Sequence, residues 1–275
     1  MKLPIHQVDA FTSAVFRGNP AAIVPLRRPL PDATLQAIAA ENNLSETAYV
    51  VLPDGGATAA AAAPLPLRWF TPAVEVDLCG HATLAMAFVL FREGLVTGEV
   101  VRFQTASGVL SVQRRGERLE LDFPSRPPRP VPADRSAAVL DELAAALGRR
   151  PREAVAARDL FAVYDDAEDV ITMQPDFGRL ATIDTFAVCA TAPGRDGTDF
   201  VSRFFAPRKG VPEDPVTGSS HCSLTPYWAG RLGRTRLAAR QASARGGEIA
   251  CELAGDRVRL GGRCVEYLRG EIEVP

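Results

Sequence analysis

The string RWFTPAVEVDLCGHAT at residues 68–83 has a related copy, RFFAPRKGVPEDPVTGSSH, at residues 203–221. Both strings begin with Arg, two aromatic residues, a small residue and a Pro; acidic residues follow, and then a Gly that opens an apolar segment. A second pair of matches follows, because Gly108 to Gly116 and Gly247 to Gly255 have the same spacing of eight residues. Several matches in one order, at an offset of about 135 to 139 residues, predict two lobes with one topology.

A Pro-rich segment, PSRPPRPVP at residues 124–132, separates the two halves of the repeat. A run this rich in Pro forms neither a helix nor a central strand, so we expect a stiff, extended crossover. The predicted lobes are residues 1–124 and 133–275, and the last strand of the chain can pack back on the first lobe. Residues 55–66 are rich in Ala, Gly and Pro and predict a hairpin loop.

The local sequence predicts the elements of each lobe. Residues 82–91 contain no charged residue, and a helix that is apolar on every face must be enclosed on all sides. This pattern favours a curved sheet wrapped around a central helix in each lobe. Glu46 begins ETAYVVL, a β-branched and aromatic run that predicts a strand. Asp32 and Ser136 are predicted to cap two further helices.

Composition and charge exclude several classes of protein. The net charge is −2 and the pI is near 6.0, whereas nucleic-acid and anionic-membrane surfaces need concentrated Lys and Arg. The chain starts without an apolar signal region, and the apolar stretch at residues 78–91 is too short to span a bilayer. Five cysteines without a C-x-x-C pair and three histidines without ligand spacing favour neither disulfides nor a metal site. We therefore expect a cytoplasmic protein without metal, nucleic-acid or membrane partners.

Small residues open both predicted central helices, with Gly80 in the first half and Gly218-Ser219 in the second. The first turn of a helix offers unpaired N–H groups and the positive end of its dipole, which together bind a carboxylate. Taken alone, each Gly is explained as a backbone turn. Because the repeat pairs them, we expect the two helix starts to face one cleft between the lobes and to stabilise an enolate there without a metal.

Three polar residues near these helix starts are candidates for proton transfer. Most acidic residues are exposed to solvent. Glu46, however, lies where a predicted helix ends and an apolar strand begins, so we expect its carboxylate at the edge of a core. A partly buried carboxylate of this kind suits a proton shuttle. His81 sits at a helix N-terminus, which predicts a lowered pKa and a neutral imidazole. Asp214 precedes a Pro and could serve only to start a turn. His6 and His221 are interpreted as structural.

Six strings, in order along nearly the whole chain, resemble the PhzF-like phenazine-biosynthesis family. They are VDAF at 8–11, GNPAA at 18–22, NLSETA at 43–48, DLCGHAT at 77–83, EDPVTGS at 213–219 and Q-x-S-x-R-G-G at 241–247. The resemblance implies the α+β diaminopimelate epimerase fold. That fold has two pseudo-symmetric lobes, each with a curved mixed sheet around a central helix. It places the active site between the lobes, usually within a homodimer.

The same resemblance implies an activity and a set of site residues. Glu46 matches the family's acid/base Glu, while His81, Asp214 and Ser219 match residues that bind the substrate or assist proton transfer. Gly80 and Gly218 supply backbone donors. The implied enzyme is a cofactor-independent isomerase that shifts a proton between carbons of a small carboxylate-bearing substrate. In phenazine producers this substrate is trans-2,3-dihydro-3-hydroxyanthranilate, but many relatives occur where no phenazine is made.

Two alternatives stay open. Racemases and epimerases of the parent fold use one Cys from each lobe, but here Cys79 at one helix start corresponds to Thr217 at the other, so a two-thiol enzyme is disfavoured. A pairing of Cys79 with Thr217, as in some proline-racemase-like dehydratases, remains part of this first alternative. The second alternative is a non-catalytic small-molecule-binding protein on the same scaffold. The presence of Glu46, His81 and Asp214 together counts against it.

Overall fold

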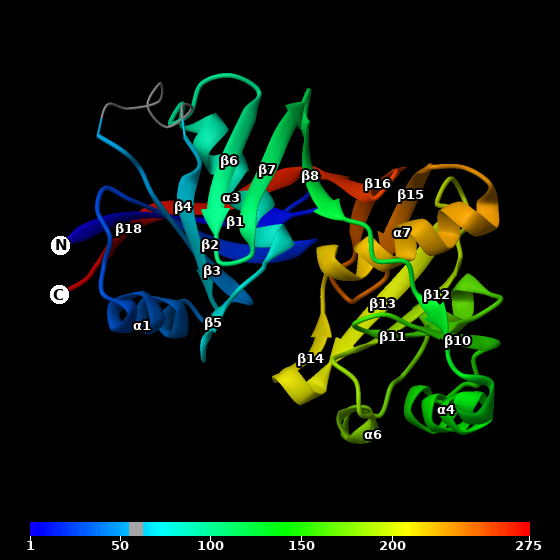
Figure 1. The fold of residues 1–275 in the computed structure, drawn as a ribbon. Helices are drawn as coiled ribbons and strands as arrows, with labels where there is room; N and C mark the ends of the chain where they lie inside the picture. The colour runs from blue at the N-terminus through cyan, green and yellow to red at the C-terminus, as the bar shows by residue number, and fades with distance from the viewer. Residues whose placement is uncertain (55–62) are drawn as a thin grey trace. The chain divides into compact units, whose positions relative to one another are not determined.

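The computed structural model describes residues 1–54 and 63–275, and the chain in it divides into two compact units (Figure 1). Unit 1 comprises Met1–Asp122 and Gly261–Pro275, and unit 2 comprises Phe123–Leu260. Although the C-terminal residues follow the second half of the repeat, they belong to unit 1. There β18 (Cys264–Glu273) pairs antiparallel with β1 (Lys2–Ala10).

The described residues of unit 1 form a mixed sheet and two helices. Its further strands are β2 (Asn19–Leu26), β3 (Glu46–Val51), β4 (Leu65–Phe70), β5 (Glu75–Val76), β6 (Val100–Thr105), β7 (Gly108–Arg115) and β8 (Arg118–Pro124). Its helices are α1 (Asp32–Asn42) and α3 (Gly80–Arg92). Strand β3 lies parallel to β2 and antiparallel to β4, and β4 pairs antiparallel with β5 and parallel with β6. Parallel and antiparallel pairs together make this sheet mixed.

Unit 2 repeats this arrangement with extra short helices. Its strands are β9 (Arg129–Pro130), β10 (Glu153–Ala156), β11 (Leu160–Val163), β12 (Val188–Pro193), β13 (Phe200–Ala206), β14 (Val211–Asp214), β15 (Arg236–Gln241), β16 (Gly247–Ala254) and β17 (Arg257–Gly262). Its helices are α4 (Ala133–Leu147), α5 (Ala167–Ile171), α6 (Phe177–Thr182), η1 (Pro207–Lys209) and α7 (Gly218–Leu232).

The strand pairings confirm the predicted repeat. In unit 1, β2 and β3 are parallel, β4 pairs with β5, and β4 and β6 are parallel. In unit 2, β11 and β12 are parallel, β13 pairs with β14, and β13 and β15 are parallel. In addition, β18 pairs antiparallel with β1 in unit 1, and β9 pairs antiparallel with β10 in unit 2. The predicted α+β class with two pseudo-symmetric lobes is therefore correct.

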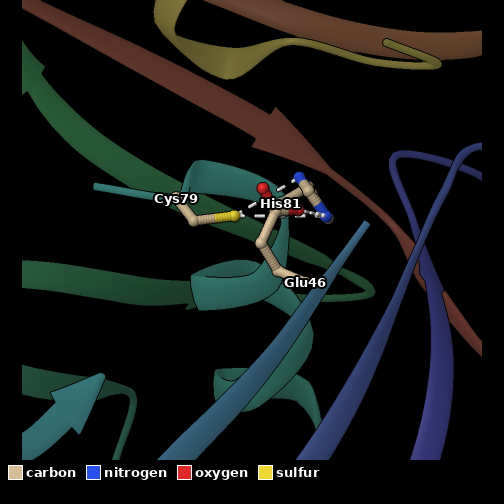
Figure 2. Close-up of side chains that lie close together, drawn as sticks. All are labelled: Glu46, Cys79 and His81. Atoms are coloured by element: carbon tan, nitrogen blue, oxygen red, sulfur yellow. Dashed lines mark hydrogen bonds and ion pairs between the residues drawn. The ribbon is translucent and has the colours of Figure 1, made fainter. Parts of the chain in front are cut away.

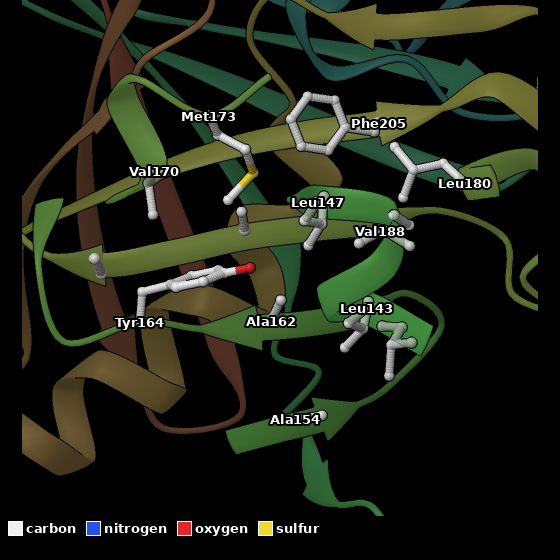
Figure 3. Close-up of a cluster of buried hydrophobic side chains, with 14 of the residues drawn as sticks. Leu143, Leu147, Ala154, Ala162, Tyr164, Val170, Met173, Leu180, Val188 and Phe205 are labelled. Atoms are coloured by element: carbon white, nitrogen blue, oxygen red, sulfur yellow. The ribbon is translucent and has the colours of Figure 1, made fainter. Parts of the chain in front are cut away.

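Each unit has one deeply buried helix, as the charge-free segment predicts for unit 1. Nine of the thirteen residues of α3 are buried, and α3 packs against β1, β2, β3, β7 and β18. Leu84, Met86 and Leu90 are fully buried. Burial of side chains of this size stabilises the fold by about 1.5–3 kcal/mol each. Helix α7 packs against β15 and β16. A further core lies where α4, α5 and α6 of unit 2 pack on β10 to β13, and Leu143, Leu147 and Phe205 are among its fully buried members (Figure 3).

Some local predictions are wrong. Asp32 and Ser136 do not cap helices, because Pro31 and Pro132 hold the N-cap positions and Ser136 lies inside α4. The carbonyl of Pro31 accepts hydrogen bonds from the N–H groups of Thr34 and Leu35, so α1 begins directly after this Pro. In the Pro-rich crossover, Arg129–Pro130 forms a short edge strand, where Pro is tolerated.

The predicted hairpin loop at residues 55–66 falls mostly outside the described residues, and its last two residues belong to β4. Among the residues that the structure does describe, no helix has the length and apolar character needed to cross a membrane.

Candidate active site

Glu46, Cys79 and His81 form a compact cluster at the N-terminus of α3 (Figure 2). Glu46 is the first residue of β3, Cys79 is the N-cap of α3, and His81 is in the first turn. Oε2 of Glu46 lies 3.0 Å from Nε2 of His81, and Sγ of Cys79 lies 3.5 Å from Nδ1 of the same ring. The imidazole therefore lies between a carboxylate and a thiol.

Backbone geometry explains why these side chains meet. Gly80 starts α3 directly after Cys79, whose extended backbone (φ −142°, ψ 111°) turns its thiol toward the first helical turn. Thr83 donates its hydroxyl hydrogen bond to the Cys79 carbonyl and secures that turn. Strand β3 enters the sheet at Glu46, and the following residues Thr47 to Val50 are buried. Glu46 thus sits at the boundary between core and surface, with its side chain 18% exposed.

The cluster is buried, and burial changes its electrostatics. Cys79 and His81 are only 6% and 5% exposed. Burial acts to lower the pKa of His81, but the charges of Cys79 and Glu46 and the hydrogen bond to Cys79 act in the opposite direction and prevail, so this pKa lies well above 6.5. Burial, and then the charge of Glu46, raise the pKa of the Cys79 thiol to about 11. The ring and the thiol therefore both hold their protons more tightly than they would in water.

The predicted neutral state of His81 is therefore wrong. The argument from the helix N-terminus considered only the dipole, which favours the uncharged ring. It omitted Cys79, two residues away, and Glu46, which lies more than thirty residues earlier in the sequence and reaches the ring only in the folded chain. These two neighbours raise the pKa of the ring above its ordinary value.

In unit 2 a buried glutamine organises the residues before α7. Thr217, the N-cap of α7, donates its hydroxyl hydrogen to Oδ2 of Asp214 and its N–H to Oε1 of Gln241, the latter over 2.8 Å. Nε2 of Gln241 donates to the Asp214 carbonyl over 2.7 Å and to Oγ1 of Thr217 over 3.1 Å. Gln241 is completely buried. Asp214 is thus held by a network and is more than a turn-forming residue.

An arginine lies beside Ser219 in the first turn of α7. Nη2 of Arg158 donates to Oγ of Ser219 over 2.9 Å, and the same guanidinium donates to both carboxylate oxygens of Asp159, over 3.0 and 3.2 Å. Asp159 is 3% exposed. Burial raises its pKa, whereas the contact with Arg158 acts to lower it. Arg158 is also stacked over the ring of Phe186, 4.2 Å from the centroid.

Each unit therefore gathers its own predicted residues at the start of its buried helix. Glu46, His81 and Gly80 come together in unit 1, and Asp214, Gly218 and Ser219 occupy the loop and first turn of α7 in unit 2. Neither N-cap residue, Cys79 for α3 or Thr217 for α7, has a side-chain capping hydrogen bond to its helix.

Sequence reasoning missed Gln241, Arg158 and Asp159 as site residues. Gln241 stood in a family-like string but carried no local signal of its role, because its partners lie 24 and 27 residues earlier. Arg158-Asp159 is one of many charged pairs in the sequence, and no local signal indicates that the fold buries Asp159 and leaves Arg158 exposed. Glu46, Cys79 and His81 are also the ligand types that a metal ion takes, with their nearest ligand atoms all within 4.8 Å of one another.

The fold places the chain among proteins built like epimerases of the proline-racemase type. A hydroxyproline epimerase from Agrobacterium vitis superposes with a TM-score of 0.60 over 98% of this chain and 92% of that one, at 11% identity. This likeness concerns the fold alone, which is the diaminopimelate epimerase-like architecture expected from the sequence.

Closer comparisons define the family. The chain belongs to the phenazine biosynthesis-like (PhzC-PhzF) family, whose model matches residues 8–270. A Pseudomonas aeruginosa protein named as an uncharacterized isomerase is 48% identical over 274 residues, covering 100% of both chains. The crystal structure of a PhzF-family protein from Enterococcus faecalis superposes with a TM-score of 0.92 at 46% identity, again over 100% of both chains. The resemblance inferred from the sequence is confirmed.

Proposed function

We propose that the protein is a cofactor-independent isomerase that shifts a proton between carbon atoms of a small carboxylate-bearing substrate, with Glu46 as the acid/base group. The observation that carries this proposal is the Glu46–His81 pair, 3.0 Å apart and largely withdrawn from water at the start of α3. Similarity to proteins named as isomerases supports the reaction class.

The chemistry follows from the charges of the pair. The Glu46 carboxylate takes a proton from a substrate carbon, and the C–H electron pair passes into the adjacent unsaturated system as an enolate-type anion. The protonated ring of His81 and the first-turn N–H groups of α3 offset the developing negative charge. Glu46 then returns the proton to another carbon of the same system. Atoms and electrons balance within the substrate, so the step needs no oxidant or reductant.

The start of α7 in unit 2 is a proposed carboxylate-binding group in its own right. Gly218 and Ser219 stand in the first turn of a fifteen-residue helix, where backbone N–H groups and the dipole favour a carboxylate. Hydrogen bonds among Gln241, Thr217 and Asp214 fix the backbone of the loop that leads into this helix. Rigid placement of this kind is what orientation of a substrate requires.

The test is hydrogen exchange in heavy water. Candidate carboxylates, beginning with trans-2,3-dihydro-3-hydroxyanthranilate, are incubated with the protein, and deuterium incorporation at carbon is followed by NMR. Glu46→Gln should lower the exchange rate on the order of 100-fold or more, the usual contribution of a general acid/base group. Glu41→Gln, which changes an exposed Glu of α1, is the matched control and should exchange at the wild-type rate. Wild-type exchange by Glu46→Gln would refute the assignment.

A thiol-based epimerase or dehydratase is the second candidate, because Sγ of Cys79 lies 3.5 Å from His81 Nδ1 in an arrangement typical of an activated nucleophile. Two observations disfavour it. The pKa of the thiol is raised to about 11, which leaves little thiolate at neutral pH. The position equivalent to Cys79 at the start of α7 is Thr217, whose hydroxyl is bound to Asp214.

The same assay distinguishes the proposed isomerase from a non-catalytic binding protein on this scaffold. Such a protein would be stabilised thermally by a carboxylate ligand and would show no exchange at carbon. Stabilisation together with exchange supports the isomerase.

A further inference from the structure

We propose that Glu46, Cys79 and His81 form a binding site for a zinc ion, which enters in place of protons and blocks the proton carrier. The nearest ligand atoms of the three side chains all lie within 4.8 Å of one another. A thiolate, an imidazole and a carboxylate are the ligand types that Zn²⁺ takes in proteins, and three protein ligands leave a fourth tetrahedral position for water.

The three side chains are near enough to reach one ion after a change of rotamer. With Zn–S near 2.3 Å and Zn–N and Zn–O near 2.0–2.2 Å, two ligand atoms on one ion lie about 3.4–3.6 Å apart. Sγ of Cys79 is 3.5 Å from Nδ1 and 4.0 Å from Nε2 of His81, whereas Oε2 of Glu46 is 3.0 Å from Nε2. Thiol and carboxylate thus approach different nitrogens of the ring, so rotation of the His81 and Cys79 side chains must accompany binding of an ion through one nitrogen.

The carboxylate of Glu46 also has spare capacity to bind an ion. Its Oε2 atom is buried and has no aligned hydrogen-bond partner among the described residues, although it lies 3.0 Å from His81 Nε2. The contact is thus an ion pair without good hydrogen-bond geometry. A buried oxygen in this state normally has a partner, and a metal ion would provide one.

A second cluster of similar composition lacks this feature. His6, Glu93 and Glu266 also bring ligand atoms within 4.8 Å. However, both oxygens of Glu93 accept hydrogen bonds from Arg269, over 3.0 and 2.6 Å, and Glu266 contacts Arg92 and His6. A cation there would have to displace guanidinium groups, and the cluster has no thiol. Zinc should therefore prefer the cluster at the start of α3.

Binding replaces protons by the metal. The S–H bond of Cys79 breaks, its proton leaves to the buffer, and the sulfur electron pair forms the Zn–S bond. The proton on His81 Nε2 leaves in the same way as nitrogen becomes a ligand. With the Glu46 oxygen also on the metal, the carboxylate no longer accepts a proton from carbon. This last consequence, inhibition, rests on the proposed function, whereas the binding itself does not.

The binding test uses zinc chloride and the reduced full-length chain in calorimetric titration. We expect saturable Zn²⁺ binding that weakens at least about 100-fold in Cys79→Ser and in His81→Gln, since loss of even an outer-sphere partner of a metal site costs 10–100-fold. Cys222→Ser, a buried thiol on α7, and His6→Gln, in the second cluster, are the matched controls and should bind as the wild type does. Circular dichroism verifies that each variant is folded.

Cobalt provides a second readout that reports the sulfur directly. Co²⁺ should give a thiolate charge-transfer band in the wild type and in Cys222→Ser but not in Cys79→Ser. Absence of Zn²⁺ binding to the wild type, or its loss in His6→Gln with retention in Cys79→Ser, would overturn the proposal. Exchange at carbon should fall with added Zn²⁺ and return with a chelator. A protein that binds zinc but shows no exchange would defeat the proposed isomerase and leave the metal site standing.

Discussion

His81 Nε2 and Glu46 Oε2 lie 3.0 Å apart, although their residues belong to a helix and a strand that are separate in sequence. The pair is only partly accessible to water, because the side chains are 7% and 18% exposed. It joins the first turn of α3 to the first residue of β3. The chemistry proposed for this protein depends on that contact, because the ring makes a charged partner for the carboxylate that is expected to carry the proton.

Replacement of Cys79 separates the two catalytic candidates. If Glu46 is the proton carrier, Cys79→Ala removes only a neighbouring thiol, and exchange at carbon should fall by less than about 10-fold, below the scale of a lost general acid/base group. If the thiol is the base, Cys79→Ala should abolish exchange while Glu46→Gln is tolerated. Deuterium incorporation measured for both variants on one substrate distinguishes these results.

Gln241→Ala should destabilise unit 2 and disturb the start of α7. The substitution leaves the buried N–H of Thr217 and carbonyl of Asp214 without the partners that Gln241 provides. Each unsatisfied buried group costs about 1–3 kcal/mol. Urea unfolding should show this loss, and KM should rise more than kcat falls if the network positions substrate. An unchanged midpoint of unfolding would contradict the role assigned to Gln241.

His221 should make the folded state sensitive to mild acid. It is fully buried, and burial lowers its pKa to about 4, from an ordinary value of 6.5. Between these values the unfolded chain binds a proton that the folded chain refuses, so this contribution to stability is complete above pH 6.5 and is lost as the pH falls toward 4. The expected loss between pH 7 and pH 5 is about 2 kcal/mol.

The check on His221 is urea unfolding of the wild type and His221→Gln at both pH values. Glutamine can still donate a hydrogen bond to the Thr217 carbonyl, the group that His221 Nδ1 contacts at 2.7 Å. The difference in stability between the two proteins should shift with pH by the stated amount. Parallel pH profiles for wild type and variant would show that His221 does not titrate differently in the folded state.

The repeat contains a matched pair of salt bridges that differ in burial. Arg203 donates to both oxygens of Glu213 over 2.8 and 2.9 Å, with side chains 11% and 18% exposed. The corresponding Arg68–Glu75 pair is 38% and 41% exposed. Glu213→Ala leaves the buried guanidinium of Arg203 without its carboxylate partner and should lower the free energy of unfolding by about 3–5 kcal/mol. Glu75→Ala should lower it by no more than about 1 kcal/mol. Equal losses of unfolding free energy in the two variants would show that burial does not set the difference.

Much of the architecture was predictable because its signals are local. The Gly-opened helices α3 and α7, the strand at Glu46 and the paired hairpins all follow from residues close together in sequence. The predicted caps at Asp32 and Ser136 failed for a local reason, because a Pro holds each N-cap position. Other predictions failed because the fold decided the outcome. The pKa of His81 depends on Cys79 and on the distant Glu46, and the burial of Asp159 has no signal in the sequence around it.

The duplication, the enclosed helix in the first lobe and the family can be read from the order of residues alone, because spacing, turn residues and motif order are properties of the linear chain. Which side chains meet depends on how the chain folds. Folding brings the Cys79 thiol, the His81 imidazole and the Glu46 carboxylate together at α3. It also brings Gln241 into hydrogen-bond contact with Asp214 and Thr217. Such contacts set burial and local charge, and these in turn set the protonation of each group, which no linear pattern encodes.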